Sequence, residues 1–398
     1  MNNVPPGYKQ TEVGVIPEEW DVQPLGALVG YTNGKAHEQS INDSGRFVVV
    51  NSKFISTEGF TRKYSEHSFC PASKGDVLMV MSDVPNGRAI AKCYWVESDN
   101  TYTVNQRICI LNPRGIDGKL LLYKLDRNPF YLAFDDGAKQ TNLRKDEVLA
   151  CPLGIPKSEA EQRAIATALS DVDGLLGALD RLIAKKRDLK QAAMQQLLTG
   201  QTRLPGFHGE WEVKRLGEMC EIAMGRTPPR LSPAFWGRGY KWLSIADLQS
   251  KVVAQSKEEI TELAASGMNI IPKGTLLMSF KLSIGRLCFA GCDLFTNEAI
   301  CSFNKLQADA EFLYYALSRT DFSLYGKQAV KGYTLNKESL KLVEVRLPST
   351  TSEQTAIAAV LSDMDAELAL LEQRLAKTRA LKQGMMQELL TGRVRLIN

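Results

Sequence analysis

The sequence has few features of a membrane protein, a secreted protein or a metalloenzyme. No apolar run approaches the roughly 20 residues that a membrane-spanning helix needs, and residues 1–20 lack the apolar core of a signal peptide. Histidine occurs three times, as His37, His67 and His208, at spacings that form neither a ligand set nor a catalytic triad. We therefore expect a cytoplasmic protein without a membrane partner and without a metal ion.

Motifs for catalysis and cofactor binding are also missing. The chain has no G-x-x-x-x-G-K-[ST] phosphate loop. The run Asn128–Tyr131 faintly resembles an amino-methyltransferase motif, but its second proline is missing and no glycine-rich loop precedes it. The eight cysteines are scattered, with one close pair, which predicts buried free thiols in a reducing compartment. We expect a protein that is not an enzyme and binds no cofactor of its own.

Length and charge leave the class of partner open. A chain of 398 residues is long enough for two or three domains. The formal net charge is +4 and the isoelectric point about 8.5. This mildly basic balance permits a polyanionic partner without requiring one.

One segment of the chain occurs twice. Residues 161–204 align without a gap to residues 353–396 at an offset of 192, and about 25 of the 44 positions are identical. The intervening sequences correspond in order but share few residues. The repeating unit is therefore a variable module followed by a nearly constant segment. Such a pattern predicts two modules that recognise different targets and two segments that share one partner surface or pair with each other.

The constant segments carry a heptad pattern typical of a coiled coil. The apolar positions are spaced by four and three residues, and they are Ile165, Leu169, Val172, Leu176, Leu179, Ile183, Ile357, Leu361, Met364, Leu368, Leu371 and Leu375. Ser158 or Ser352 is expected as the N-cap, and Gly200 and Gly392 as C-cap glycines. A helix of about 40 residues is about 60 Å long.

The two apolar stripes match in phase, which favours antiparallel pairing of the two helices. The alternative is that each helix packs on its own module or on another protein. Antiparallel pairing would relate the two halves by an approximate two-fold axis and make the arrangement circular. Arg163, Lys190 and Gln191, with Lys382 and Gln383, would then serve the helix surface or the docking of other subunits.

The modules indicate an α+β fold. Residues 47–52, 76–82 and 275–280 are β-branched or apolar and bounded by glycine or turn residues, as strands are. Residues 119–125 and 311–318 are expected to form short helices.

Basic, polar and aromatic residues gather in turn-rich stretches of both modules, which suits contacts to DNA phosphates and base edges. A solvated surface is the alternative for each of these residues. The candidate DNA-contacting residues are Lys35, Arg88, Lys139 and Arg144 in the first module, and Arg226, Arg286, Lys331 and Tyr333 in the second.

The repeated "EQ-x-x-IA-x-x-LS-x-x-D" and "LK-Q-x-x-M-Q-x-LLTG-x-x-R" resemble the conserved regions of the specificity subunit of type I restriction-modification systems. The order "EW…LG", "KGD" and "IP" or "LP" within each half is similar to that family as well. The chain lacks the second proline that usually precedes the "EQ" pair. The resemblance covers essentially the whole chain.

The resemblance implies two target recognition domains, residues 1–156 and 201–348, each reading half of a bipartite site in double-stranded DNA. It implies that residues 157–200 and 349–398 form the spacing coiled coil. The subunit would dock two modification (methyltransferase) subunits and join restriction/translocase subunits, with S-adenosylmethionine, ATP and Mg²⁺ bound only on those partners. Two rival hypotheses stay open: a coiled-coil adaptor with two peptide-binding modules, and a self-contained methyltransferase.

Overall fold

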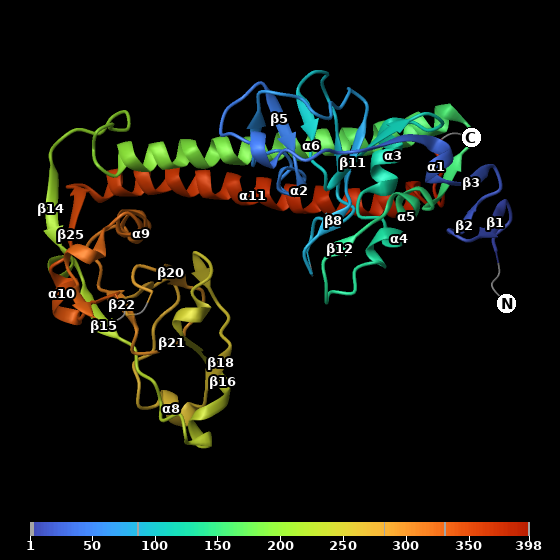
Figure 1. The fold of residues 1–398 in the computed structure, drawn as a ribbon. Coiled ribbons are helices and arrows are strands. Elements are labelled where there is room, and N and C mark those ends of the chain that lie inside the picture. Colours follow the sequence, from blue (N-terminus) through green and yellow to red (C-terminus); the bar gives the residue numbers. More distant parts are fainter. Residues whose placement is uncertain (1–3, 86, 282, 330–331, 397–398) are drawn as a thin grey trace. The chain divides into compact units, whose positions relative to one another are not determined.

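The computed structural model describes residues 4–85, 87–281, 283–329 and 332–396. Its contacts divide the chain into two units: Met1–Asp180 with Gln373–Asn398, and Arg181–Glu372. Each unit holds one mixed α/β module and one part of each long helix, α6 (Glu159–Leu197) and α11 (Thr351–Leu389) (Figure 1). These units cut across both long helices, whereas the sequence-based boundaries kept each helix whole.

The module of the first unit contains thirteen strands among the described residues. They are β1 (Tyr8–Thr11), β2 (Gly14–Pro17), β3 (Trp20–Pro24), β4 (Val29–Asn33), β5 (Phe47–Val50), β6 (Tyr64–Ser65), β7 (Val77–Val80), β8 (Ser82–Asp83), β9 (Cys93–Trp95), β10 (Tyr102–Val104), β11 (Ile108–Pro113), β12 (Thr141–Asn142) and β13 (Pro152–Pro156). Its short helices are α1 (Leu25–Leu28), η1 (Glu38–Ser40), α2 (Ser52–Ser56), α3 (Gly118–Leu125), α4 (Pro129–Leu132) and α5 (Lys145–Leu149).

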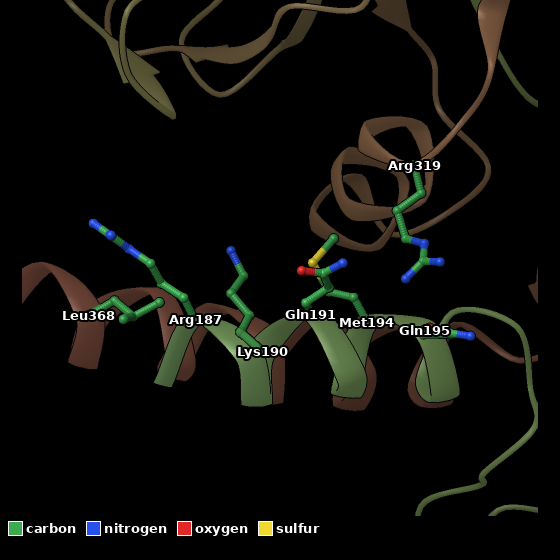
Figure 2. Close-up of a pocket in the computed structure, with 7 residues that line it drawn as sticks. All are labelled: Arg187, Lys190, Gln191, Met194, Gln195, Arg319 and Leu368. Atoms are coloured by element: carbon green, nitrogen blue, oxygen red, sulfur yellow. The ribbon is translucent and has the colours of Figure 1, made fainter. Parts of the chain in front are cut away.

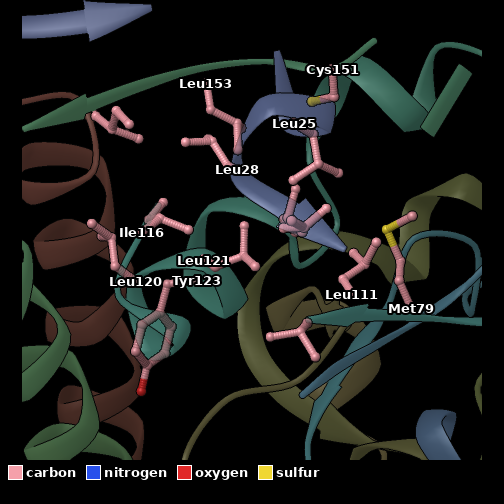
Figure 3. Close-up of a cluster of buried hydrophobic side chains, with 14 of the residues drawn as sticks. Leu25, Leu28, Met79, Leu111, Ile116, Leu120, Leu121, Tyr123, Cys151 and Leu153 are labelled. Carbon is pink, nitrogen blue, oxygen red and sulfur yellow. The ribbon is translucent and has the colours of Figure 1, made fainter. Parts of the chain in front are cut away.

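The central sheet of this module has the order β4-β11-β7-β9, and a second sheet has the order β10-β5-β6. Alternate residues of β7 serve two cores: Val77 and Met79 face α1 and α3, whereas Leu78 and Val80 face the second sheet. Figure 3 shows part of the first core, where Leu120 and Leu121 of α3 meet Leu25 and Leu28 of α1. Strand and helix were both predicted correctly here.

The second unit repeats this plan. Its strands are β14 (Trp211–Arg215), β15 (Glu221–Met224), β16 (Trp236–Leu243), β17 (Val252–Val253), β18 (Glu258–Ile260), β19 (Leu276–Ser279), β20 (Leu287–Ala290), β21 (Phe295–Thr296), β22 (Ile300–Asn304), β23 (Lys327–Ala329), β24 (Gly332–Thr334) and β25 (Glu344–Pro348). Its short helices are α7 (Leu216–Met219), η2 (Pro233–Phe235), η3 (Ile245–Asp247), α8 (Glu262–Ala265), α9 (Ala310–Ser318), η4 (Phe322–Leu324) and α10 (Lys337–Lys341).

The central sheet of the second unit has the order β15-β22-β19-β20-β17. Its first four strands repeat β4-β11-β7-β9, and β17 is an addition at the edge. The flanking sheet differs, with the order β18-β16-β21. The repeated plan confirms the α+β fold with two related modules. The modules differ in the flanking sheet and in the added edge strand β17.

The two long helices run antiparallel within each unit and lie side by side (Figure 1). In the first unit, Ile165 and Leu169 near the start of α6 share one core with Leu389 at the end of α11. In the second unit, Ile357 and Leu361 near the start of α11 share a core with Leu197. Antiparallel pairing and packing on the module therefore occur together. Among the described residues, every helix is too short or too polar to span a bilayer.

Ion pairs across the helices repeat in both units. Lys382 pairs with Asp173 (2.6 Å) in the first unit, and Lys190 pairs with Asp365 in the second. A tyrosine of the adjoining module donates a hydrogen bond to the same aspartate: Tyr123 to Asp173 at 2.7 Å, and Tyr315 to Asp365 at 2.6 Å. These pairs are half-buried and still reached by solvent, which weakens their contribution to stability, so the repeated geometry mainly fixes how module and helices meet.

The contacts of the repeated Glu-Gln pair explain why residues at both ends of the constant segment are the same in the two copies. Arg203 pairs with Glu353 through two bonds of 2.6 and 2.7 Å, and Arg395 pairs with Glu161 in the same bidentate way, with 2.7 Å between Nη2 and Oε2. Both glutamates are buried. The exit arginine of one helix is thus bound to the start of the other helix.

The neighbouring glutamine joins the same helix start to the module. The Gln162 amide donates to the Pro156 carbonyl (2.8 Å) and accepts from the Asp117 N–H (2.8 Å). Gln354 does the same in the second unit. Gly200 and Gly392 follow the helices with φ of +71° and +72°, as expected of C-cap glycines.

One predicted helix cap is wrong. Ser158 does precede α6, and its hydroxyl accepts from the Glu161 N–H at 3.4 Å. Ser352, however, lies inside α11, which begins at Thr351. The residue that corresponds to Ser158 at the offset of 192 is Thr350. The error arose because two threonines and a serine stand in succession before the Glu-Gln pair.

Candidate nucleic-acid interface

The central sheet of each module brings three loops to one edge. In the first module β4 and β7 both pair antiparallel with β11, so their carboxyl ends meet the start of β11. In the second module β15 and β19 flank β22 in the same way. We use the name loop edge for the described residues of the loops at this sheet edge. They are residues 33–35, 81–85, 87–92 and 105–107 in the first module, and residues 224–226, 280–281, 283–286 and 297–299 in the second.

Lys35 stands on the first of these loops. Its N–H donates to the Val104 carbonyl at 2.9 Å, and its side chain is exposed. The preceding Gly34 packs so closely that a Cβ there would lie 2.0 Å from the carbonyl oxygen of Asn105. Glycine is required at this crossing, and it fixes the direction in which the chain presents Lys35.

Arg226 occupies the corresponding position of the second module. Its N–H donates to the Thr296 carbonyl at 2.8 Å, and a Cβ on the preceding Gly225 would lie 2.2 Å from the Asn297 carbonyl. The Arg226 side chain is exposed, with one long bond to the Gly267 carbonyl (3.4 Å). Lys35 and Arg226, which were chosen separately from the sequence, therefore occupy equivalent positions in the two modules.

Arg88 and Arg286 both lie on the loop that follows the central strand β7 or β19. Asp83 shapes the first loop by accepting from the Ala89 N–H (2.6 Å) and the Ile90 N–H (3.1 Å). The Ser279 hydroxyl shapes the second by accepting from the Arg286 N–H at 3.1 Å. Both guanidinium groups are exposed, so the second loop of each module carries an exposed cation, as the first loop does.

The remaining candidates are placed differently. Lys139 lies on the loop before β12, which pairs with β8 next to the loop edge, and its side chain is exposed. Arg144 stands before α5, with its guanidinium bound to Glu147 at 2.7 and 3.0 Å. Lys331 lies outside the described residues. Tyr333 lies on β24, which forms a hairpin with β23.

The sequence-based selection missed exposed side chains on the third loop. Gln106 and Arg107 precede β11 in the first module; in the second, the exposed Glu298 and the buried Ala299 occupy these places. Thr227 donates a hydrogen bond to Glu298, which is the main cause that lowers the pKa of this carboxyl. Corresponding loops thus carry opposite charge in the two modules. The alignment of "VNQR" (residues 104–107) with "TNEA" (residues 296–299) is the sequence signal that could have identified these loop residues.

An arginine packed against a pair of tryptophans was also missed. The Arg230 guanidinium lies 4.1 Å from the ring centre of Trp236 and 4.7 Å from that of Trp242, and it pairs with Glu258 at 2.6 Å. Trp242 in turn donates to the Arg226 carbonyl at 3.0 Å. These contacts connect Arg230 and Trp242 to the loop that carries Arg226, and the first module has no tryptophan at these positions.

The chemistry of these edges suits binding. In the described part of the chain no cluster of His, Cys, Asp and Glu is arranged to hold a metal ion. Burial raises the pKa of the Cys109 and Cys288 thiols to about 12, so both stay protonated at neutral pH. Exposed cations, amides and hydroxyls on rigid strand ends can contact phosphates and base edges.

Comparison with known proteins agrees with this geometry. The sequence profile of the type I restriction modification DNA specificity domain matches residues 17–185 and again residues 208–378. Each match spans one module and most of the helix that follows. The chain belongs to the type I restriction-modification specificity family. Its members are named as the specificity subunits of these enzymes, and no comparison supports the peptide-binding adaptor.

Individual relatives match either nearly the whole chain or a part of it. The MjaX specificity subunit of Methanocaldococcus jannaschii is 24% identical over 427 residues, covering 98% of this chain and 97% of the relative. The MjaIX specificity subunit of the same organism is 33% identical over 165 residues, covering 39% and 38%. The crystal structure of a type I S subunit from M. genitalium superposes with a TM-score of 0.63 at 16% identity, covering 93% and 96%. The family assignment thus makes this chain a DNA-recognition subunit.

Proposed function

We propose that the chain reads a bipartite site in double-stranded DNA, one half-site with each loop edge. The observation that carries this proposal is the contrast between the two units. The loop edges share their backbone plan but differ in side chains, as Arg107 and Ala299 do, whereas the helical segments that join the modules share about 25 of 44 positions. A protein that reads two different half-sites at a fixed separation needs variable recognition loops and a constant helical connection.

The paired helices would set the separation of the half-sites. Each long helix has 39 residues, which corresponds to about 58 Å at 1.5 Å per residue. Recognition modules that read one face of a duplex work at separations of about one helical turn or its multiples. The helix length therefore fixes the unspecified spacer between half-sites, and the loops fix the bases.

We further propose that the chain performs no chemistry and acts through other subunits. These would be two modification subunits that use S-adenosylmethionine and restriction/translocase subunits that use ATP and Mg²⁺, in the cytoplasm where the DNA lies. A solved structure that superposes on this chain with a TM-score of 0.58 is described as showing complex assembly of a type I restriction-modification system. The support within this chain is its duplicated helical segment, which offers two related surfaces.

Methylome sequencing of a host with and without this gene tests the proposal. We expect a bipartite methylated motif that appears only when the chain is present. In a variant with seven residues inserted at matched points of α6 and α11, the half-sites should stay the same while the spacer changes. A motif that is continuous, or a methylome that does not depend on the chain, would contradict the proposal. Equilibrium binding of S-adenosylmethionine to the purified chain should be absent.

A further inference from the structure

Two large apolar side chains of the described residues are almost fully exposed, Leu231 at 99% and Phe60 at 93%. The next most exposed, Leu324, is at 77%. One of the two stands in each module. Single apolar residues are common on protein surfaces, so the surroundings of Leu231 and Phe60 decide whether they have a role.

Leu231 lies on the loop that continues from the loop edge of the second module. Arg226 ends that part of the loop edge, and residues 227–232 lead from it to η2. The Ser232 N–H donates to the Pro229 carbonyl at 3.2 Å, so Leu231 is the third residue of a tight turn. Such positions favour Gly, Asn, Asp and Ser. A leucine there gains almost no burial when the chain folds.

Two tryptophans anchor this loop. The Trp236 indole N–H donates to the Pro229 carbonyl at 3.1 Å, and the Trp242 indole N–H donates to the Arg226 carbonyl at 3.0 Å. The Arg230 guanidinium packs against both rings. The leucine is therefore presented to solvent by a backbone that is bonded to the rest of the module.

Exposed arginines stand on the same loop and on the neighbouring strand. Arg226 is exposed, and so is Arg238, which lies on a bulge of β16 where the pairing with β18 is interrupted. A Cβ on Gly239 would lie 2.4 Å from the Ile260 carbonyl oxygen, so glycine is required beside this arginine. Bulges commonly redirect a side chain. Leu231 is thus an apolar tip in cationic surroundings.

Phe60 has a similar setting in the first module. It lies on the loop after α2 and follows Gly59, whose φ is +82°. The exposed Arg62 donates from Nε to the Gly59 carbonyl at 2.9 Å. Lys92 of the loop edge donates to the Ser56 carbonyl at 3.3 Å, so this loop adjoins the loop edge. Each module therefore carries one exposed apolar tip, with an exposed arginine near it, beside its loop edge.

We propose that Leu231 and Phe60 are wedges that enter the base stack of the DNA, one at or beside each half-site, and kink the duplex there. This inference rests on the proposed function, because it requires that the loop edges face DNA. Proteins that kink DNA insert Phe, Leu, Ile, Met or Pro between base pairs. Removal of the apolar side chain from water offsets the cost of unstacking. The arginines would bind the phosphates around the opened step.

A wedge selects a DNA sequence without a hydrogen bond to any base. Pyrimidine–purine steps such as TA and CA kink and unstack more easily than other steps. Each module would therefore prefer such a step where its wedge enters, in addition to the bases that its loops contact. Loss of the wedge should relax selection at this step and leave the other positions of the half-site unchanged.

A projecting leucine could instead enter a partner protein. A protein interface combines an apolar centre with a polar rim. The second unit has a surface of that composition in a hollow of about 560 Å³ beside α6, where Met194 and Leu368 lie with Arg187 and Lys190 (Figure 2). Leu231 stands on a different segment, as a single apolar tip among arginines and prolines, which suits insertion into a polyanion better.

The test uses the chain assembled with its modification subunits on a duplex that carries the methylated motif. 2-Aminopurine, whose fluorescence rises when it loses stacking, replaces adenine at one position at a time, with the methylated adenines excluded. We expect a rise on binding at one step in or beside each half-site. Leu231→Ala should remove most of the rise at one of these steps and Phe60→Ala at the other. Leu231→Met should keep the rise, because methionine also serves as a wedge.

Competition binding gives a second readout. A purine–purine step in place of the unstacked step should weaken wild-type binding about tenfold and Leu231→Ala binding by less than about twofold, because both changes remove the same interaction. Leu342→Ala is the matched control and should behave as wild type. Leu342 is 52% exposed in the same unit and follows α10, which packs on α7 at the opposite end of β15 from the loop edge.

The outcomes are separable. If the wild-type complex does not prefer the methylated motif to unrelated DNA, the proposed function itself is wrong. If it binds the motif specifically but no position outside the methylated adenines loses stacking, the wedges are wrong and the proposed function stands. Unchanged stacking and step preference in Leu231→Ala or in Phe60→Ala would overturn the assignment of that residue. If Leu231→Ala loses a modification subunit in native mass spectrometry and keeps the unstacked step, the side chain binds protein and the inference is overturned.

Discussion

Replacing Arg395 by methionine should destabilise the first unit by leaving a buried carboxylate without its cation. Glu161 is only 2% exposed, and Arg395 gives it a bidentate pair. Breaking a buried ion pair from one side costs about 3–5 kcal/mol. The Trp20 indole N–H remains 3.4 Å from Glu161 and Arg395 is partly exposed, so water can enter. We therefore expect the lower end, about 3 kcal/mol.

Hydrogen–deuterium exchange resolved by residue measures this change unit by unit. A loss of about 3 kcal/mol corresponds to a roughly hundredfold faster exchange of the slowest amides. These amides should lie in β7 and β11, while those of β19 and β22 serve as an internal control. Arg203→Met removes the matching pair with Glu353 and should produce the reverse pattern.

A double variant separates the lost charge pair from the lost side chain. Glu161→Gln with Arg395→Met leaves no buried charge, and its stability should return to within about 1 kcal/mol of wild type. The reasoning is refuted if Arg395→Met alone leaves the exchange of β7 and β11 unchanged. It is equally refuted if the double variant is as unstable as the single one.

Three further outcomes are expected. Burial lowers the pKa of Lys124 to about 7; between that value and the ordinary 10.5 the unfolded chain binds a proton that the folded chain does not, so the first unit gains stability as pH rises. Lys124→Met, which makes this position apolar like the corresponding Ala316, should remove this slope and stabilise the unit by about 2 kcal/mol at pH 6.5 in thermal unfolding; a variant that loses stability there would contradict the sign. Lys35→Ala and Arg226→Ala should each relax recognition of one half-site by about 1–3 kcal/mol in competition binding, leaving the other half-site unchanged; equal effects on both half-sites would argue against one module per half-site. The isolated chain should bind DNA weakly, with affinity falling steeply as salt rises; tight, specific binding at physiological salt would contradict this.

The sequence predicted the parts of the fold that depend on local pattern. The heptads indicated both long helices and their pairing, because the stripe from Ile165 to Ile183 must be buried. Runs of apolar and β-branched residues bounded by glycine indicated β7 and β19. The order of strands in the sheets could not be predicted, since the pairing of β4 with β11 joins residues far apart in the chain. The bonds from Arg203 to Glu353 and from Arg395 to Glu161 could not be predicted either, although all four residues belong to the repeated segment.

The candidate interface was predicted in part. Lys35 and Arg226 were chosen for their loops, and the structure then showed that they correspond. Arg107 was overlooked because it stands at the head of an apolar strand and resembles part of that strand. Lys190 was assigned to the helix surface or to docking, and its pairing with Asp365 explains the first role. Whether any candidate contacts DNA stays a prediction.

The repeated contacts at the helix ends make the modules exchangeable. The bonds of Gln162 and of the Tyr123–Asp173–Lys382 group, which hold the first module to the helices, have equivalents in the other half. A recombination event that cuts within the repeated helical segments would therefore preserve these bonds. New pairs of half-sites can then arise by exchange of whole modules, because the contacts between module and helices stay the same.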